Sequence, residues 1–267
     1  KITDTSAKEF VERMVKSGHG AMLEHGTVYL LLNMASRQQY FKYCSNPYSV
    51  ANSTGEAEKG TWLGFVTTNY RVLVENNWLD DLQYICEPGK EHEKRITVKF
   101  VCDRGVSHEF VRHRVFSFAQ ESTRYCNYSK DKFGNELTFI IPCWLDIPED
   151  TYTLGKLRSK DNPEQTCMVE ISKNHGAYNV ESAIGKFLHV LDYSSDRYME
   201  LINEGWKPQQ ARAVLPNSLK TELIMTGTIE QWKGFFVLRD APSAHPQARE
   251  LAEPLHAEFI KRGWLNN

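Results

Sequence analysis

A fourteen-residue stretch near the middle of the chain gathers most of the side chains that could perform chemistry. Between Arg112 and Tyr125 it holds three arginines, one histidine and two serines. Guanidinium groups bind phosphate, or the imide edge of a uracil-like base, through paired N–H donors. Three such cations held together repel one another unless an anion lies among them. Because the chain has a formal net charge of −2, we expect this anion to be a small molecule rather than a polynucleotide.

A solvated basic helix face is the simplest alternative for this stretch, and its aromatic residues argue against that alternative. Phe116, Phe118 and Tyr125 are interleaved with the charged positions. Aromatic side chains gain free energy by packing, so they would hold the segment against the body of the protein. We therefore predict a ligand-binding segment.

Common catalytic motifs are absent from the chain. His108-Glu109 precedes His113, but a zinc-binding helix needs its histidines four residues apart, so that both lie on one face. At 3.6 residues per turn, a spacing of five turns the second histidine about 140° away. The sequence contains no P-loop, no dinucleotide-binding glycine motif and no G-x-S-x-G. We predict no metal site.

The segment resembles the signature of the flavin-dependent thymidylate synthases. That signature is R-H-R-x-x-S-x-x-x-x-S-x-R-Y, and every fixed position is present. Other segments are similar to parts of the family in the same order: Gly18-His19 with Leu23-Glu24-His25, then Ala211-Arg212-Ala213-Val214-Leu215-Pro216, then Phe235-Phe236-Val237-Leu238-Arg239. His25 lies at the edge of an expected strand, where a structural role is the simpler expectation.

The resemblance implies an enzyme that makes dTMP from dUMP. The family takes the one-carbon unit from methylenetetrahydrofolate and the hydride from NADPH through bound FAD, and its members are homotetramers with active sites between subunits. The resemblance makes Arg239 the catalytic residue, facing the pyrimidine and favouring its form ionised at N3. This role is physically sound because a cation beside an imide lowers the pKa of the imide.

The other site residues also follow from the resemblance, position by position. The contacts implied for FAD are His19, Arg112, His113, Arg114, Gln120, Thr228, Glu230 and Gly234. The contacts implied for dUMP are Glu109, Arg112, Gln120, Glu121, Ser122, Arg124, Arg212 and Arg239.

Four of these positions depart from the family's usual residues. Glu109 stands where glutamine is usual, and Gln120 stands where glutamate is common. Thr228 and Gly234 stand where the family often supplies asparagine to the flavin. We expect the Glu109 carboxylate to need a compensating cation, and any flavin contact at the last two positions to come from the backbone.

Hydrophobic periodicity and turn residues predict an α+β fold that positions these residues. Helices are expected at about residues 6–16 (capped by Ser6 and Glu9), 66–85, 181–203, 229–238 and 246–262, with short ones capped by Ser107, at Asn162-Pro163 and from Pro208 to Pro216. Strands are expected at 27–32, 96–102 and 137–141, a loop at 45–61, and either strand or helix at 219–226. We predict one domain over residues 1–267, with a mixed or antiparallel sheet flanked by helices and a probable insertion at about 35–95.

Composition is that of an ordinary globular protein, with 41% hydrophobic and 25% charged residues. No stretch is long and apolar enough for a membrane span or a signal peptide. The six cysteines lie far apart without a C-x-x-C pair, so we expect free thiols in a reducing cytoplasm. Because the chain starts at Lys1 rather than methionine, we expect a natural N-terminal segment, with the family's first strand, to precede it.

Two competing functions stay open. Pro142-Cys143 followed by Arg158-Ser159-x-Asp161 loosely resembles the nucleophile and phosphate arginine of flavin-independent thymidylate synthases, which use a cysteine. We expect the Cys143 thiol to be buried and neutral, which argues against this role. The other alternative is a non-enzymatic nucleic-acid-binding module centred on the arginines. Bound FAD would distinguish the first interpretation from both.

Overall fold

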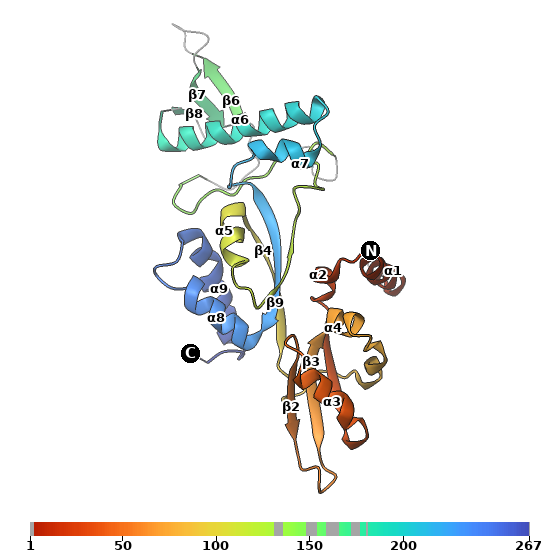
Figure 1. Ribbon diagram of the computed structural model, residues 1–267. Coiled ribbons are helices and arrows are strands. Elements are labelled where there is room, and N and C mark those ends of the chain that lie inside the picture. Colours follow the sequence, from red (N-terminus) through yellow and green to blue (C-terminus); the bar gives the residue numbers. More distant parts are fainter. Residues whose placement is uncertain are drawn as a thin grey trace. The chain divides into compact units, whose positions relative to one another are not determined.

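The computed structural model describes residues 3–130, 136–147, 154–158, 166–171, 177–179 and 181–266 (Figure 1). They form helices and three three-stranded sheets, so the α+β class is confirmed, with its strands divided among separate sheets. The chain splits into two compact units. The first unit comprises Lys1–Phe100, Val111–Ala119 and Leu223–Asn267, and the second comprises Val101–Phe110 and Gln120–Glu222. A single domain over the whole chain stays a prediction.

One sheet of the first unit has the strand order β1-β3-β2 and is antiparallel. Its strands are β1 (Thr27–Leu32), β2 (Val50–Thr54) and β3 (Leu63–Asn69), and helix α3 (Arg37–Cys44) packs against it. Leu30 of β1 lies opposite Val66 of β3, and both are completely buried beside Tyr43 of α3. The predicted insertion at 35–95 therefore supplies the central strand of a sheet that it shares with β1.

The helix predicted over residues 66–85 is wrong. Strand β3 continues to Asn69, whose side-chain oxygen accepts a hydrogen bond from the Val72 backbone at 3.1 Å and starts the short helix α4 (Tyr70–Glu75). A 3₁₀ turn, Leu79–Tyr84, follows. The β-branched run from Val66 to Thr68 is buried in the sheet, and side chains of this shape favour strands over helices.

Smaller predictions also need correction. The region predicted as a loop at 45–61 contains β2. Helix α1 (Asp4–Lys16) is capped by Thr3 with Ser6, rather than by Ser6 with Glu9. Residues 137–141 form only an isolated bridge between Phe139 and Leu219, and Ser107 lies inside helix α5 (Arg104–Phe110) rather than at its cap. The helix predicted at Asn162-Pro163 lies outside the described residues.

A buried carboxylate ties α3 to the turn after α4. The Asp81 side chain accepts a hydrogen bond from the Tyr43 hydroxyl at 2.5 Å and pairs with the Lys42 ammonium at 2.5 Å. Burial, followed by the hydrogen bond to Asp81, raises the pKa of the Tyr43 hydroxyl, so Tyr43 stays a neutral donor. This cluster provides a test of how much the segment 35–95 contributes to stability.

We expect Asp81→Ala to lower the free energy of unfolding by about 3 kcal/mol, because it leaves a buried hydroxyl and an ammonium group without their acceptor. The matched control is Asp80→Ala, since Asp80 is exposed on the same turn and should cost about 0.5 kcal/mol or less. Urea unfolding followed by circular dichroism measures both. Equal losses for the two variants would contradict the structural role of Asp81.

The C-terminal helices build an aromatic core in the first unit. Thr228 caps α8 (Ile229–Arg239), which packs against α9 (Pro246–Lys261). Both helices confirm the sequence prediction. Trp232 and Phe235 of α8 are completely buried, and the Trp232 indole donates a hydrogen bond to the Ile96 carbonyl at 3.1 Å. This carbonyl belongs to β4 (Arg95–Asp103), in a sheet of order β4-β9-β5 with β9 (Lys220–Thr228) and β5 (Ser117–Gln120).

The second unit contains the predicted long helix, α6 (Ala183–Asn203). It contacts an antiparallel sheet of order β6-β7-β8, formed by Leu154–Arg158, Thr166–Ile171 and Ala177–Asn179 (Figure 1). Helix α7 (Pro208–Ala211) begins at a proline, as predicted, and a 3₁₀ turn, Arg212–Val214, continues it. Tyr198, Ala211 and Leu219 form a core cluster in this unit, so the loop that carries Arg212 is firmly anchored.

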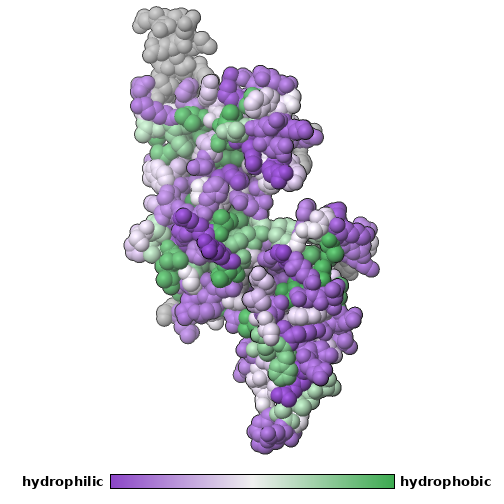
Figure 2. Space-filling model, viewed as in Figure 1, coloured by the Kyte–Doolittle hydropathy of each residue, from purple (hydrophilic) through white to green (hydrophobic). Residues whose placement is uncertain are grey.

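Hydrophobic side chains also reach the surface. On the β1-β3-β2 sheet, the exposed fractions are 41% for Leu31, 37% for Leu63 and 59% for Ile85, which bridges to Leu30. Figure 2 shows hydrophobic surface, in green, at the lower end of the view, where Figure 1 draws β2 and β3. None of the helices in the described ranges is long and apolar enough to cross a membrane.

Candidate active site

The RHR turn, which we define as Arg112, His113 and Arg114, links α5 to β5. Arg112 and Arg114 are exposed, whereas His113 is half-buried. No hydrogen bond or ion pair engages the guanidinium of Arg112 or Arg114 among the residues that the structure describes. Phe116, which is 5% exposed, anchors the turn by packing edge-on against Trp232, with ring centroids 4.7 Å apart. The turn thus presents two unpaired cations from a rigid base.

His113 and Arg239 are 126 residues apart in sequence and meet in the first unit. The Arg239 Nε–H donates a hydrogen bond to His113 Nε2 at 3.0 Å. Burial, together with the positive charge of Arg239, lowers the pKa of His113 to about 4. His113 is therefore neutral near pH 7 and can accept this hydrogen bond.

The three flavin positions predicted on or before α8 differ in what they offer. The Thr228 hydroxyl caps the helix by accepting from the Gln231 backbone at 3.2 Å, so its side chain already has a structural partner. A Cβ atom added at Gly234 would meet nothing within 4 Å, so this position presents open backbone. Glu230 is exposed and lies 3.7 Å from Lys233. Flavin contacts at these three positions stay a prediction.

The segment that carries His19 lies between α1 and α2 (Gly20–Leu23). His19 is exposed, and within the described ranges no hydrogen bond joins its ring to another side chain. Arg71 of α4 holds the next turn, because its guanidinium binds the Glu24 carboxylate at 2.6 Å and lies so close to Gly20 that an added Cβ would come within 2.8 Å of its Nε. No motif or spacing in the sequence indicates this contact, which joins α4 to a segment 47 residues away.

His25 is a hydrogen-bonded structural residue, as expected. Its Nδ1 lies 2.7 Å from the Thr226 hydroxyl, which in turn lies 2.7 Å from the Thr97 hydroxyl. Burial lowers the pKa of His25 below its ordinary value. Sequence reasoning missed the nearby Arg95, whose guanidinium donates to the Glu24 carbonyl at 3.0 Å and to the Ser117 hydroxyl at 3.1 Å. Arg95 begins a strand, and nothing in the neighbouring sequence indicates which groups its side chain contacts.

In the second unit, the polar residues after β5 are held by a lysine. Lys220 lies 3.4 Å from the Glu121 carboxylate and 3.1 Å from the Glu222 carboxylate. Burial opposes its charge, but the two carboxylates together raise the pKa of Lys220. The Gln120 amide donates to the Ser107 hydroxyl at 2.8 Å. Glu121 and Gln120 therefore have structural partners, and Lys220 is a residue that the sequence motifs did not identify.

Two arginines of the second unit lie in or contact the segment 122–125. The Arg212 guanidinium donates to the Thr123 hydroxyl at 3.1 Å, although the two are 89 residues apart. Arg124, next in sequence, is exposed and lies over the Tyr125 ring at 5.4 Å. The Ser122 hydroxyl accepts from the Arg124 backbone at 3.3 Å. A guanidinium beside a hydroxyl group suits a phosphate monoester. Glu109 lies on α5 in this unit and is partly buried.

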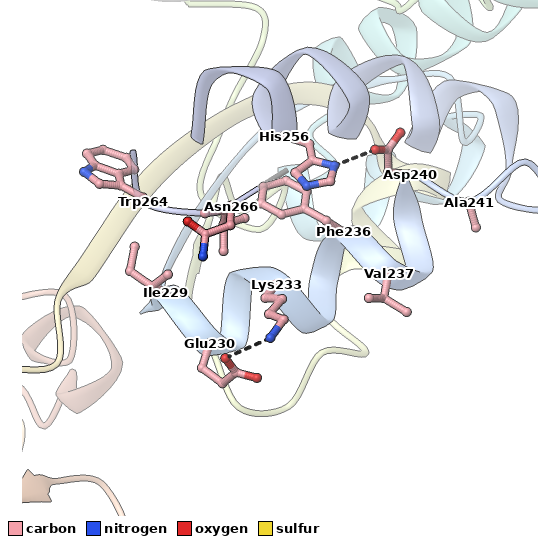
Figure 3. Close-up of a pocket in the computed structure, with 11 residues that line it drawn as sticks. Ile229, Glu230, Lys233, Phe236, Val237, Asp240, Ala241, His256, Trp264 and Asn266 are labelled. Carbon is pink, nitrogen blue, oxygen red and sulfur yellow. Dashed lines mark hydrogen bonds and ion pairs between the residues drawn. The ribbon is translucent and has the colours of Figure 1, made fainter. Parts of the chain in front are cut away.

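A separate hollow of about 670 Å³ lies along α8, α9 and the C-terminal residues (Figure 3). His256 stacks on Phe236 with ring centroids 4.5 Å apart and binds the Asp240 carboxylate at 2.7 Å. The residues that line this hollow include Glu230, but no residue of the RHR turn. Across the described residues, no group of three histidines, cysteines or carboxylates could hold a metal ion.

The family model described as "Thymidylate synthase complementing protein" matches residues 91–262, which is more than half of the chain. The chain belongs to this family. The matched range contains every predicted site residue except His19. The predicted insertion at about 35–95 lies almost entirely before the match, and it stays a prediction.

Curated relatives carry the name flavin-dependent thymidylate synthase. The one from Pyrococcus furiosus is 29% identical over 205 residues, which cover 75% of this chain and 70% of the relative. The one from Corynebacterium glutamicum is 28% identical over 176 residues, which cover 64% of this chain and 61% of the relative. Among solved structures, a UMP/dUMP methylase from Streptomyces cacaoi bound with 5-Br dUMP is 20% identical, with a TM-score of 0.42, covering 62% of this chain and 66% of that chain.

One expectation from the sequence is wrong. The Cys143 residue is exposed rather than buried. The sequence placed it after an expected strand, but residues 137–141 make only one bridge among the residues that the structure describes, so the prediction of burial behind a strand does not hold. Burial therefore no longer argues against a cysteine nucleophile, and Ser159 and Asp161 of that alternative lie outside the described residues.

Proposed function

We propose that this chain is a flavin-dependent thymidylate synthase, which methylates dUMP to dTMP with methylenetetrahydrofolate as the one-carbon donor and NADPH as the source of hydride through FAD. The observation that carries this proposal is the RHR turn. Its two exposed guanidiniums have no carboxylate partner among the described residues, and they flank a neutral histidine that holds Arg239. The names of the curated relatives support the same activity.

The residues present fit FAD in part. Arg112 and Arg114 suit its diphosphate, because unpaired guanidiniums bind phosphate oxygens with paired N–H donors. At Thr228 and Gly234 the chain offers backbone rather than free side-chain amides. When bound, FAD would supply the redox chemistry by carrying the hydride. The part left to the protein is to bind, orient and polarise the nucleotide.

Two arginine clusters would divide the work on dUMP. Arg212, which donates to the Thr123 hydroxyl, and the exposed Arg124 would bind the 5′-phosphate. Arg239, with its Nε fixed by His113, would face the imide edge and stabilise the pyrimidine with N3 deprotonated, because a nearby cation lowers the pKa of that N–H. We further propose that the enzyme is a homotetramer with active sites between subunits, as the family resemblance implies.

Flavin uptake tests this proposal directly. Purified protein should show flavin absorbance, or gain it when FAD is added, and Arg112→Gln with Arg114→Gln should weaken FAD binding about 10-fold or more. The matched control is Lys16→Gln on α1, an exposed cation outside the proposed site, which should bind FAD normally. Wild-type protein that takes up no FAD would refute the proposal and leave the cysteine-dependent and nucleic-acid-binding alternatives.

A further inference from the structure

His113 accepts the Arg239 hydrogen bond through a ring that its surroundings hold in place. The ring centroid lies 5.0 Å from that of Phe235 and 6.3 Å from that of Phe116. Phe235 is completely buried and Phe116 is 5% exposed. Two packed aromatic neighbours therefore restrict the rotation of the imidazole, and they fix the direction in which Nε2 points.

The aromatic side chain that packs against His113 and the arginine that donates to it come from the same helix. Phe235 and Arg239 are four residues apart on α8, so they lie on one face, one turn apart. Phe235 packs against the imidazole while Arg239 donates to it. His113 therefore contacts α8 twice, through the ring of Phe235 and through the hydrogen bond from Arg239.

The protonation states of the two side chains determine which of them donates the hydrogen bond. Arginine has only donors, so His113 must present a lone pair at Nε2. Burial and the Arg239 charge lower the pKa of His113 to about 4, so near pH 7 the ring is neutral and carries its proton on Nδ1. The guanidinium is planar, so fixing its Nε–H together with its stem sets the orientation of the whole group.

We infer that His113 is the positioning residue of Arg239: it sets the plane of the guanidinium that is to face the substrate pyrimidine. This inference rests on the proposed function and gives His113 a task besides the flavin contact that the family resemblance implies. The same hydrogen bond couples the position of the RHR turn to the position of Arg239 on α8. Displacing the turn would change the orientation of Arg239, although their backbones are remote in sequence.

Two substitutions at His113 separate positioning from other roles. Glutamine can place an amide oxygen near the location of Nε2, whereas the shorter asparagine places it near Nδ1. We expect His113→Gln to keep kcat for dUMP methylation, measured per bound flavin, within about 3-fold, and His113→Asn to lower it about 10-fold or more, with the KM for NADPH unchanged in both. The exposed His108 gives a matched control, because His108→Asn should change none of these quantities.

Combining variants tests whether His113 acts through Arg239. In an Arg239→Gln background, His113→Asn should cause no additional loss of kcat, because its target is already absent. Equal losses for His113→Gln and His113→Asn, or losses that multiply in the double variant, would overturn the inference. Circular dichroism and thermal unfolding check that each variant is folded.

A measurement that needs no activity keeps this inference separate from the proposed function. In wild-type protein labelled with ¹⁵N-histidine, nuclear magnetic resonance at pH 7 should show His113 as the neutral tautomer, with Nδ1 protonated and Nε2 unprotonated. In the Arg239→Gln variant the pKa of His113 should rise, since one of the two causes of its depression is gone. A protonated Nε2 in the wild type would overturn the positioning role. The same spectrum with no dUMP methylation would instead refute the proposed function.

Discussion

Arg239→Ala should lower dTMP formation at least ~100-fold, the scale seen when a group that stabilises developing charge is removed. The substitution removes the cation proposed to favour the N3-ionised pyrimidine and leaves His113 Nε2 without its donor. Tritium release from labelled dUMP, with NADPH and methylenetetrahydrofolate present, measures the reaction. Flavin absorbance must be checked in the variant, so that a lost cofactor is not mistaken for lost chemistry.

Cys143→Ala is the companion to this experiment. Cys143 is exposed, so its accessibility alone would allow a nucleophilic role. In the flavin mechanism no thiolate needs to add to C6 of dUMP, and we expect Cys143→Ala to keep most of the activity. A folded, flavin-loaded Cys143→Ala protein that is inactive, alongside a nearly normal Arg239→Ala protein, would show that the flavin mechanism is wrong for this chain.

Arg124→Ala should raise the Kd for dUMP by about 10- to 100-fold, the range expected when a charge-assisted contact to phosphate is removed. The guanidinium is exposed and adjacent to Thr123, where Arg212 is already held. Isothermal titration calorimetry with dUMP measures the change.

Deoxyuridine, which has no phosphate, provides the internal comparison for Arg124. Its affinity should be nearly the same for the wild type and Arg124→Ala. The matched protein control is Arg197→Ala, because Arg197 is a partly exposed arginine of α6 paired with Glu200 and outside the proposed site. A loss of affinity for deoxyuridine as large as that for dUMP would assign Arg124 to the base rather than to the phosphate.

The fold could be predicted from sequence where the spacing of apolar residues in a segment matches one type of element. Helices α6 and α9 have a clear periodicity and strand β1 a short apolar run, and their predicted limits agree with the structure within a few residues. Helix α8 also agrees with its predicted limits, although its apolar residues are not confined to one face. The same logic failed over residues 66–85, where apolar residues occur at both helical and strand spacing. There the Asn69 cap divides a strand from a helix. A single sequence does not reveal which pairing partner a segment will find, and that partner decided the outcome.

The candidate site could be predicted as a set of residues, but not as a set of contacts. The signature identified the RHR turn and Arg239, but only the structure gives the hydrogen bond between His113 and Arg239. Arg71, Arg95 and Lys220 were missed because each acts through a partner that its local sequence does not indicate. Polar contacts over long sequence separations depend on tertiary packing, which composition and spacing do not encode.

The position of β3 between β1 and β2 has a consequence for how this chain could have evolved or be shortened. A typical insertion is attached to its host only at its two ends, so trimming it leaves the scaffold intact. Here, excising residues 35–95 would strip β1 of its paired neighbour and uncover Leu30 and Leu32, which are completely buried. A shortened version would therefore need a replacement strand at that edge of β1, so residues 35–95 cannot be removed as a separable segment.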